Sequence, residues 1–201
     1  LLPGFPVFLG PWEHETTERG REQRFGNLIA TRLQVSRVQH HLLPWPPDAK
    51  VSSMPRMCTA ITLRSAELGA LRVMTTHLES SSPTQRAAQA EALRALHVEA
   101  CAQAACPPTP DLPDDLGSPF QPKLHTQQAV LCGDFNMPPT DPAYAALVQP
   151  FSLPDGSRHE LHDAWCAQYG SGAPHAPTFR LFDRRYGPDP VARDFLFLSG
   201  S

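Results

Sequence analysis

The sequence lacks the features that mark membrane-spanning, zinc-binding and nucleic-acid-coating proteins. It has no apolar run of the roughly 18 residues that a membrane-spanning helix needs. Only 18% of its residues are charged and the net charge is −3, which argues against a broad basic surface for gripping duplex DNA. Its five cysteines show no zinc-type spacing, and we expect reduced thiols in a cytoplasmic protein: Cys58, Cys101, Cys106, Cys132 and Cys166.

Proline, by contrast, is plentiful, with 23 residues in a chain of 201. A chain of this length can bury a substantial core, and we interpret residues 1–201 as a single domain. Six of the prolines lie between residues 106 and 127, a stretch without a clear hydrophobic period. We interpret 106–127 as a proline-rich insertion loop, which either shapes access to a site or is a plain linker.

Apolar and alternating stretches predict strands arranged around one long helix. We expect a strand over 25–32, prolonged past a turn over 33–38, a hairpin from 57–63 and 70–76, and a last strand over 191–198. A helix should begin with Ser82 as N-cap, Pro83 at its first position and Gln85 completing a capping box, and should run to about Ala105. Short helices should begin near 141 and 161, whereas 1–24 and 150–160 should be irregular.

The stretch over 129–136 is where a buried strand meets polar groups. Ala-Val-Leu-Cys over 129–132 has no polar face, so we expect both sides to be covered. Gly133 permits a turn, and Asp134 and Asn136 follow it. Their side chains would point the same way if the extended period of two continued, which suits a hard cation, a phosphate or an activated water. A strand followed by an Asx-rich turn is the alternative reading.

Polar groups mark the ends of two further predicted strands. His77 follows one strand, and Asp194 interrupts the start of another. An acid before Phe-Leu-Phe-Leu is costly if it is buried alone, so Asp194 should have a hydrogen-bond donor, for which a histidine is the first candidate. Each residue alone is a weak signal, and the combination of His77, Asp134, Asn136 and Asp194 at separate strand ends points to one active site.

These motifs resemble the endonuclease/exonuclease/phosphatase superfamily, which includes the DNase I-type nucleases. Gly133-Asp134-Phe135-Asn136 is similar to a hallmark segment of that superfamily. The other matching segments occur in the family's order and are Phe25 to Arg32, Arg56, Thr76-His77-Leu78-Glu79 with Arg86 and Gln89, Asp163-Ala164-Trp165, Thr178-Phe179, and Arg193-Asp194-Phe195-Leu196-Phe197. The resemblance extends over about residues 25–198.

The resemblance implies an α/β fold, a four-layer αββα sandwich of the DNase I-like type. It also implies hydrolysis of a phosphoester with Mg²⁺ or Mn²⁺. In that scheme Asp134 orients or deprotonates the attacking water, Asn136 and His77 stabilise charge on the phosphoryl oxygens, and Asp194 fixes a catalytic histidine. Arg56 and Asn136 would contact the substrate phosphate. Asp134 and Asn136 are the candidate metal ligands, and one family branch uses equivalents of these two residues and His77 for a second metal.

Two family segments have no counterpart in this sequence. The family has an upstream strand ending in Gln-Glu, whose glutamate holds the metal, and a downstream Ser-Asp-His. The sequence is therefore either a fragment lacking the first strands and the last motif or a protein with a degenerate site, and we interpret it as a fragment. Our hypothesis is that these 201 residues alone are inactive.

The sequence says less about the substrate and partners. Thr76 to Ser80 is close to a segment of tyrosyl-DNA phosphodiesterase 2-like members and of bacterial members. The acidic balance favours a small or end-of-strand phosphodiester over a strong grip on duplex DNA. A lipid or inositol phosphate phosphodiesterase or phosphatase on the same core, and a catalytically dead binding module, are the alternatives. We expect a monomer.

Overall fold

The first half of the chain consists of antiparallel strands followed by one long helix. The computed structural model describes residues 2–9, 23–107, 123–183 and 185–200. Strands β1 (Leu2–Leu9) and β2 (Gln23–Ile29) pair with each other, and β3 (Gln34–Leu42), β4 (Met57–Ser65) and β5 (Gly69–His77) form an antiparallel meander. Helix α1 (Pro83–Ala105) follows β5 and is 23 residues long.

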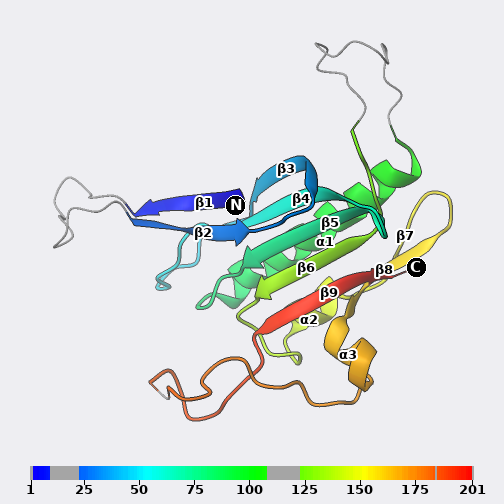
Figure 1. Cartoon of the computed structure of the whole chain (residues 1–201). Helices are drawn as coiled ribbons and strands as arrows, with labels where there is room; N and C mark the ends of the chain where they lie inside the picture. The colour runs from blue at the N-terminus through cyan, green and yellow to red at the C-terminus, as the bar shows by residue number, and fades with distance from the viewer. Residues whose placement is uncertain (1, 10–22, 108–122, 184, 201) are drawn as a thin grey trace.

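The second half supplies the centre and the far edge of the main sheet. Its elements are β6 (Ala129–Asp134), α2 (Pro142–Leu147), β7 (Phe151–Ser152), β8 (Arg158–Asp163), α3 (Ala164–Tyr169) and β9 (Asp194–Gly200). The seven strands of this sheet lie in the order β3-β4-β5-β6-β9-β8-β7 (Figure 1). Strands β5 and β6 are parallel because α1 carries the chain back between them, and the other neighbouring pairs are antiparallel.

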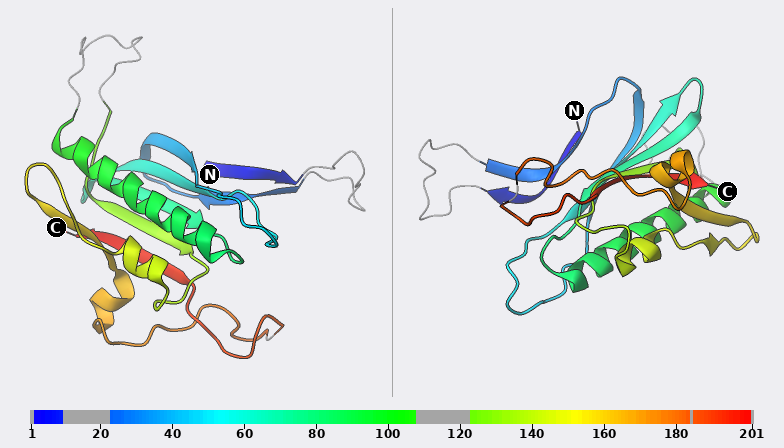
Figure 2. Two further views of the ribbon diagram at one scale, coloured as in Figure 1. Left: turned by 180° about the vertical axis from the view of Figure 1, so that it is seen from behind. Right: turned by 90° about the horizontal axis from the view of Figure 1, so that it is seen from below.

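Helices α1 and α2 cover one face of the seven-stranded sheet (Figure 2). The core between them is apolar and rich in aromatic edge contacts, such as that between Phe135 and Phe197, whose ring centroids are 5.1 Å apart. Leu93 of α1 and Leu131 of β6 are both fully buried there. Burial of this kind stabilises the fold by about 1.5–3 kcal/mol per large apolar side chain.

The β1–β2 sheet covers part of the opposite face, over β4 and β5. Ile29 of β2 packs there with Ile61 and Leu63 of β4. Asn27 ties the two sheets together, because its Nδ2 donates to the carbonyl oxygens of Met57 at 2.9 Å and Thr75 at 3.2 Å. The α/β class is therefore confirmed, with a helical layer, a mixed sheet and a second sheet stacked in that order.

Most predicted elements are present, with boundaries shifted by a few residues. The hairpin of β4 and β5, helix α1 and the last strand are confirmed. The Oγ of Ser82 accepts from the amide of Gln85 at 3.1 Å, as expected of an N-cap. The capping box is not completed, because the Oε1 of Gln85 has no hydrogen-bond partner; the Nε2 of the same side chain donates to the carbonyl oxygen of Pro46.

Three expectations about local structure were wrong. Residues 2–9 form strand β1 rather than an irregular segment, because an edge strand tolerates proline. Residues 151–152 and 158–163 form strands where a loop (150–160) and the start of a short helix (near 161) were expected, since the polar sequence of β8 still buries every second side chain. One side of β6 is only partly covered, because Val130 and Cys132 face away from α1. Most of the predicted 106–127 loop (108–122) lies outside the described residues.

No helix among the described residues is long and apolar enough to cross a membrane.

Candidate active site

His77, Asp134 and Asp194 form a row across three adjacent strands. His77 ends β5, Asp134 ends β6 and Asp194 begins β9. The strand register pairs His77 with Asp134 and Asp134 with Asp194. Paired residues of neighbouring strands project to the same face of a sheet. His77 and Asp134 are 57 residues apart in the sequence, and Asp134 and Asp194 are 60 apart. The sheet places all three side by side, at one end of these neighbouring strands.

The side chains of this row reach solvent. The Nε2 of His77 lies 3.6 Å from Oδ2 of Asp134, and the two side chains are 36% and 32% exposed. Asp194 is more exposed, and no described residue hydrogen-bonds its carboxylate. Asp194 thus lies exposed at the start of β9, as expected of a polar group at a strand end. The expected histidine partner for this acid is not found among the described residues.

Gly133 allows β5 and β6 to approach closely beside the row. Its φ is +148°, and a Cβ at this position would lie 1.9 Å from the carbonyl oxygen of Thr76 on the neighbouring strand. No side chain fits there without moving one of the two backbones. The glycine therefore determines the close packing of the two strands that carry His77 and Asp134.

Asp134 and Asn136 do not point the same way. The strand ends at Asp134, whose Oδ1 accepts from the amide of Asn136 at 2.9 Å in an Asx turn. Asn136 has a φ of +51°, which asparagine tolerates better than most residues. Its side chain is buried, where Nδ2 donates to the carbonyl oxygen of Leu78 at 2.9 Å and Oδ1 accepts from Nη1 of Arg193 at 3.1 Å. The expected period of two is broken by this turn.

Thr178 and Arg193 are site residues whose roles the sequence did not indicate. The Oγ1 of Thr178 accepts from the amides of both Arg193 and Asp194 at 3.1 Å, which fixes the start of β9. The guanidinium of Arg193 lies 4.2 Å from the ring centroid of Phe179. Both residues belong to matched family segments, but only the structure shows that Arg193 holds Asn136.

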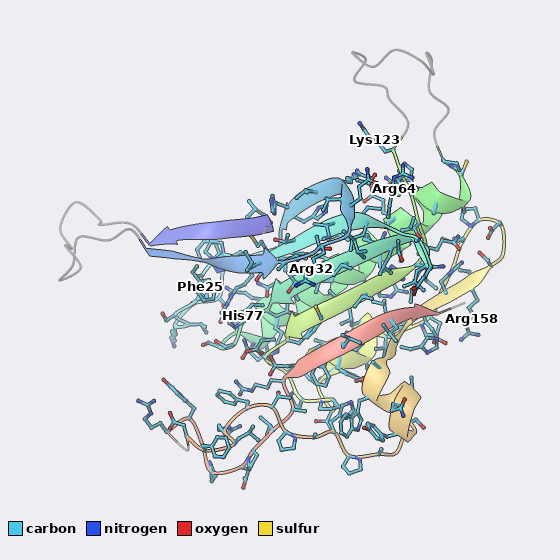
Figure 3. All side chains as sticks on the ribbon, viewed as in Figure 1. Phe25, Arg32, Arg64, His77, Lys123 and Arg158 are labelled. Carbon is cyan, nitrogen blue, oxygen red and sulfur yellow. The ribbon has the colours of Figure 1, made fainter. Side chains whose placement is uncertain are left out.

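Arg56 lies buried behind His77. It is 5% exposed, its Nε donates to Oε2 of Glu79 at 3.4 Å, and its guanidinium carbon lies 5.6 Å from the ring centroid of Phe25. The Phe25 ring in turn lies 5.5 Å from that of His77, and Figure 3 labels the two side chains at the same end of the sheet. The Nη1 of Arg56 is buried without a partner. In this arrangement Arg56 acts on His77 through its charge.

The environment shifts the pKa values of His77 and Asp134 toward their neutral forms. Burial raises the pKa of Asp134, and the nearby Asp194 adds to this shift. Burial, followed by the positive charge of Arg56, lowers the pKa of His77. The attraction between Asp134 and His77 opposes both shifts without overcoming them. His77 is therefore a neutral hydrogen-bonding group at neutral pH, and Asp134 is a stronger base than an ordinary aspartate.

The two helix residues of the matched segments have structural roles. Arg86 donates to the carbonyl oxygen of Glu79 at 3.2 Å and pairs with Oδ2 of Asp141 at 3.1 Å. Gln89 accepts from the amide of Glu79 at 2.8 Å and donates to the carbonyl oxygen of Pro44 at 3.2 Å. Together they anchor the loop after β5 and thus the position of His77.

A pocket of about 600 Å³ adjoins the row on the β9 side. Its lining includes Gly133 and Asp194, and the side chains of Trp165, Tyr169 and Leu196 make much of the rest apolar. Asp163, at its base, accepts from the hydroxyl of Tyr144 at 2.6 Å and lies 2.8 Å from Nε2 of His175. With Cys166, Asp163 and His175 carry potential ligand atoms within 4.8 Å of one another, but the hydrogen bonds account for their closeness.

The donor set of the row fits a hard divalent cation. Asp134 and Asp194 offer carboxylate oxygens on neighbouring strands, and Mg²⁺ and Mn²⁺ prefer such ligands. Asn136 fits less well, because its Oδ1 already accepts from the cationic Arg193.

No protein-family model and no curated protein matches this sequence. Among solved structures, a mannosyl-6-phosphatase of Bacteroides thetaiotaomicron superposes with a TM-score of 0.54 at 18% identity, over 99% of this chain and 63% of that one. The human Nocturnin catalytic domain gives 0.53 at 17% identity, over 96% and 59% of the two chains. An endonuclease/exonuclease/phosphatase family protein of B. thetaiotaomicron gives 0.52 at 19%, over 83% and 50%. This chain has the endonuclease/exonuclease/phosphatase fold.

The chain spans only about half to just under two-thirds of the length of these structures. Identities below one in five residues establish the endonuclease/exonuclease/phosphatase fold and no more, since proteins that share a fold differ in chemistry. The functional argument therefore rests on the row of His77, Asp134 and Asp194 and on its surroundings.

Proposed function

We propose that this chain carries part of an active site that hydrolyses phosphoesters with the help of Mg²⁺ or Mn²⁺. The observation that carries the proposal is the register of β5, β6 and β9, which aligns His77, Asp134 and Asp194 at a solvent-accessible sheet edge. Phosphoryl transfer depends mainly on positioning and on neutralising the charge that develops on oxygen. The row can do both, because His77 can donate a hydrogen bond and the two carboxylates can hold a cation that neutralises charge.

Asp134 orients the attacking water and accepts its proton in this proposal. Its carboxylate lies at the solvent-accessible end of β6, where it can take a proton from a water within hydrogen-bond reach. The Asx turn to the amide of Asn136 fixes the Oδ1 of Asp134, and Oδ2 remains on the His77 side. His77, neutral and partly exposed, donates an N–H to a phosphoryl oxygen. In the same proposal Asp194 helps to orient the cation and the water.

The divalent cation would be held by Asp134 and Asp194 and would neutralise charge on the phosphoryl oxygens. Arg193 offers a second cationic group at the same edge, already oriented by Asn136 and by the ring of Phe179. Asn136 therefore takes part chiefly by positioning Arg193. Arg56 takes part by keeping His77 neutral, because its guanidinium is too deeply buried to touch a phosphate in this arrangement.

The size and lining of the adjoining pocket favour a small or terminal phosphoester. Its volume of about 600 Å³ lies within the usual range for small-molecule sites, roughly 300–1,000 Å³. Trp165 and Tyr169 could hold a flat or apolar group attached to the phosphate. Relatives by fold are named as a mannosyl-6-phosphatase and as ANGEL2, a 2′,3′-cyclic phosphatase, and both names indicate small phosphate groups. A small or end-of-strand substrate is thus our proposal for this site.

Hydrolysis by the full-length protein tests the activity. With Mg²⁺ or Mn²⁺, we would measure turnover of a chromogenic phosphodiester, a sugar phosphate, 5′-tyrosyl DNA, abasic DNA and sphingomyelin. Asp134→Asn should lower kcat by at least about 100-fold on any substrate that is turned over, since a positioned base contributes roughly 10²–10⁴. Unchanged turnover in Asp134→Asn would refute the assignment. Turnover of sphingomyelin alone would favour the lipid alternative.

Cation binding to this 201-residue chain tests the site without needing turnover. Mn²⁺ titrated under electron paramagnetic resonance should bind the wild type and bind Asp134→Asn at least tenfold more weakly. Glu67→Gln is the matched control, because it removes one negative charge in the exposed turn between β4 and β5, at the opposite end of β5 from His77. Binding without any turnover by the full-length protein would indicate a binding module.

A further inference from the structure

Arg72, on β5, is a buried cation without a carboxylate partner. Its side chain is 6% exposed, and its Nη2 donates to Nδ1 of His97 on α1 at 2.5 Å. Its Nε is buried without any hydrogen-bond partner. Within the part of the chain that the structure describes, no aspartate or glutamate pairs with this guanidinium. A buried charge in this situation is unfavourable unless something compensates it.

The groups that touch Arg72 do not provide a negative charge. Burial and the charge of Arg72 itself lower the pKa of His97 to about 3, so the ring is neutral and accepts the hydrogen bond through Nδ1. Burial raises the pKa of Cys101, the other neighbour of His97 and Arg72, so its sulfur is a thiol at neutral pH. The positive charge of Arg72 is therefore uncompensated.

Arg72 lines a cavity of about 70 Å³ between the sheet and the second half of α1. Arg37 of β3 lines the same cavity, as do His41 and His125. A register irregularity between Val35 and Arg37 places these side chains on opposite faces of the sheet, so that Val35 packs under β2 and Arg37 faces the cavity. Glu99 is the one acid in the lining, and it accepts from Gln103 rather than pairing with an arginine.

The size of this cavity limits what it can hold. One water needs roughly 10–15 Å³ of such space, and drug-sized ligands occupy roughly 300–1,000 Å³. A volume of about 70 Å³ lies between these limits and suits a small ion. Two guanidinium groups favour an oxyanion, because their planar donors match the oxygens of phosphate, sulfate or carboxylate.

The cavity is separate from the proposed catalytic row. Arg72 precedes His77 by five positions on the same strand, which corresponds to about 16 Å at about 3.3 Å per residue. Arg64, which lies across from the start of β5, marks the cavity end of the strand in Figure 3, and His77 marks the other end. A ligand in the cavity would not touch the row.

We infer that the cavity beneath α1 is a binding site for a small tetrahedral oxyanion of the phosphate class, held by Arg72 and Arg37. The bound anion neutralises the buried guanidinium and links β3, β5 and α1. This site lies outside the proposed phosphoesterase centre and does not depend on it.

Calorimetric titration of the 201-residue chain with inorganic phosphate, at constant ionic strength in chloride, tests this inference. Arg37→Gln should weaken phosphate binding by at least tenfold. Among the described residues this substitution breaks no hydrogen bond or ion pair of the Arg37 side chain. Arg158→Gln is the matched control, because Arg158 is exposed on β8 at the far side of the sheet and its loss should change affinity less than twofold (Figure 3). Sulfate should compete with phosphate.

Phosphate bound at the catalytic row is the competing explanation, and His77→Ala distinguishes the two sites. Binding at the cavity should survive His77→Ala, and phosphate should shift the amide resonances of Thr62 and Ala100 rather than those at Asp134 and Asp194. The inference is overturned if the wild type does not bind phosphate, if Arg37→Gln binds as tightly as the wild type, or if the shifted resonances lie at the row. Sensitivity to Arg37→Gln together with insensitivity to His77→Ala supports it.

Discussion

Asp134 and Gly133 show how single residues set the chemistry of this sheet edge. Asp134 is half-buried beside another acid, and both burial and that acid raise its pKa, while His77 and Arg193 oppose the shift without overcoming it. Such an arrangement lowers stability, and shifted pKa values of this kind are common at functional sites. Gly133 is fixed by sterics, because the backbone of Thr76 occupies the space of its Cβ.

Asp134→Asn should stabilise the chain at pH 7. Because the folded-state pKa of Asp134 is raised, the folded protein binds its proton more tightly than the unfolded chain does, so ionisation as pH rises through the window above 3.8 lowers stability. Asparagine removes that cost and keeps the acceptor for the amide of Asn136. Urea denaturation should give a higher midpoint for the variant at pH 7 and no difference below pH 3.8. A lower midpoint at pH 7 would contradict this.

Gly133→Ala should destabilise the fold by about 3 kcal/mol or more, because it combines a strained backbone with overpacking against Thr76. Gly156→Ala is the matched control. Gly156 also has a positive φ, +83°, but its Cβ would meet nothing within 4 Å, so the expected cost is only about 1 kcal/mol. Chemical denaturation measures both values, and equal costs would show that the contact with Thr76 is not decisive.

At the scale of elements, α1 is the part whose local signals are most complete. Ser82 accepts from the amide of Gln85 and donates to Oδ2 of Asp48 at 2.5 Å. Pro83 occupies the first helical position, and buried residues along one side pack on the sheet. The N-terminal end of the helix is therefore fixed both to its own first turn and to the loop between β3 and β4.

Ser82→Ala should lower the free energy of unfolding by about 1–2 kcal/mol, since both the cap and the bond to Asp48 are lost. Ser81→Ala is the matched control one residue earlier. Ser81 is exposed and its hydroxyl contacts only that of Ser80, so a change within about 0.5 kcal/mol is expected. Urea denaturation of the two variants compares them directly, and a similar loss in both would argue against Ser82 as the cap.

At the scale of the whole molecule, the two sheets are unequal partners. The seven-stranded sheet has a core shared with α1 and α2, whereas β1 and β2 rest on β4 and β5 through a small cluster around Ile61. The hydrogen bonds from Asn27 to the carbonyl oxygens of Met57 and Thr75 also connect the two sheets. We expect the β1–β2 hairpin to open before the rest of the fold.

Asn27→Ala should accelerate amide hydrogen exchange in β2 and leave exchange in the centre of β6 unchanged under native conditions. The expected loss for the hairpin is about 1 kcal/mol, because the carbonyl of Met57 keeps a second donor, the hydroxyl of Thr76 at 3.0 Å. Gln34→Ala, at an exposed position of β3, is the control and should change neither strand. Equal acceleration in β2 and β6 would mean that the two sheets open as one unit.

Much of the fold could be predicted from local patterns, and the failures have physical causes. Helix α1, the β4–β5 hairpin and strand β6 follow from caps, alternation and apolar runs. Strand β1 was missed because its prolines are atypical of a strand, although an edge strand tolerates them. Strand β8 was missed because most of its residues are polar, although it buries every second side chain. Asp194 was expected to have a hydrogen-bond donor, with a histidine as the first candidate, yet its carboxylate is exposed and no described residue hydrogen-bonds it.

The candidate site was predicted as a set of residues and not as an arrangement. His77, Asp134 and Asp194 were identified at strand ends, and the register places them in one row. Asn136 and Arg56 were expected to contact a phosphate. Instead, the Asn136 side chain is buried and accepts from Arg193, and the Arg56 guanidinium is buried against the ring of Phe25. Side-chain direction after a strand depends on the turn that follows, which the residue period alone does not specify.

The sequence by itself determined most of the strands and helices, including β5, α1 and β6, and the polar groups that lie at the strand ends. These are local matters, settled by steric limits, caps and hydrophobic period. Only the tertiary structure decided that β6 lies between β5 and β9, that Arg193 meets Asn136, and that Arg72 is buried without an acid. Those contacts join residues far apart in the chain, and their burial and charge depend on neighbours that no local pattern names.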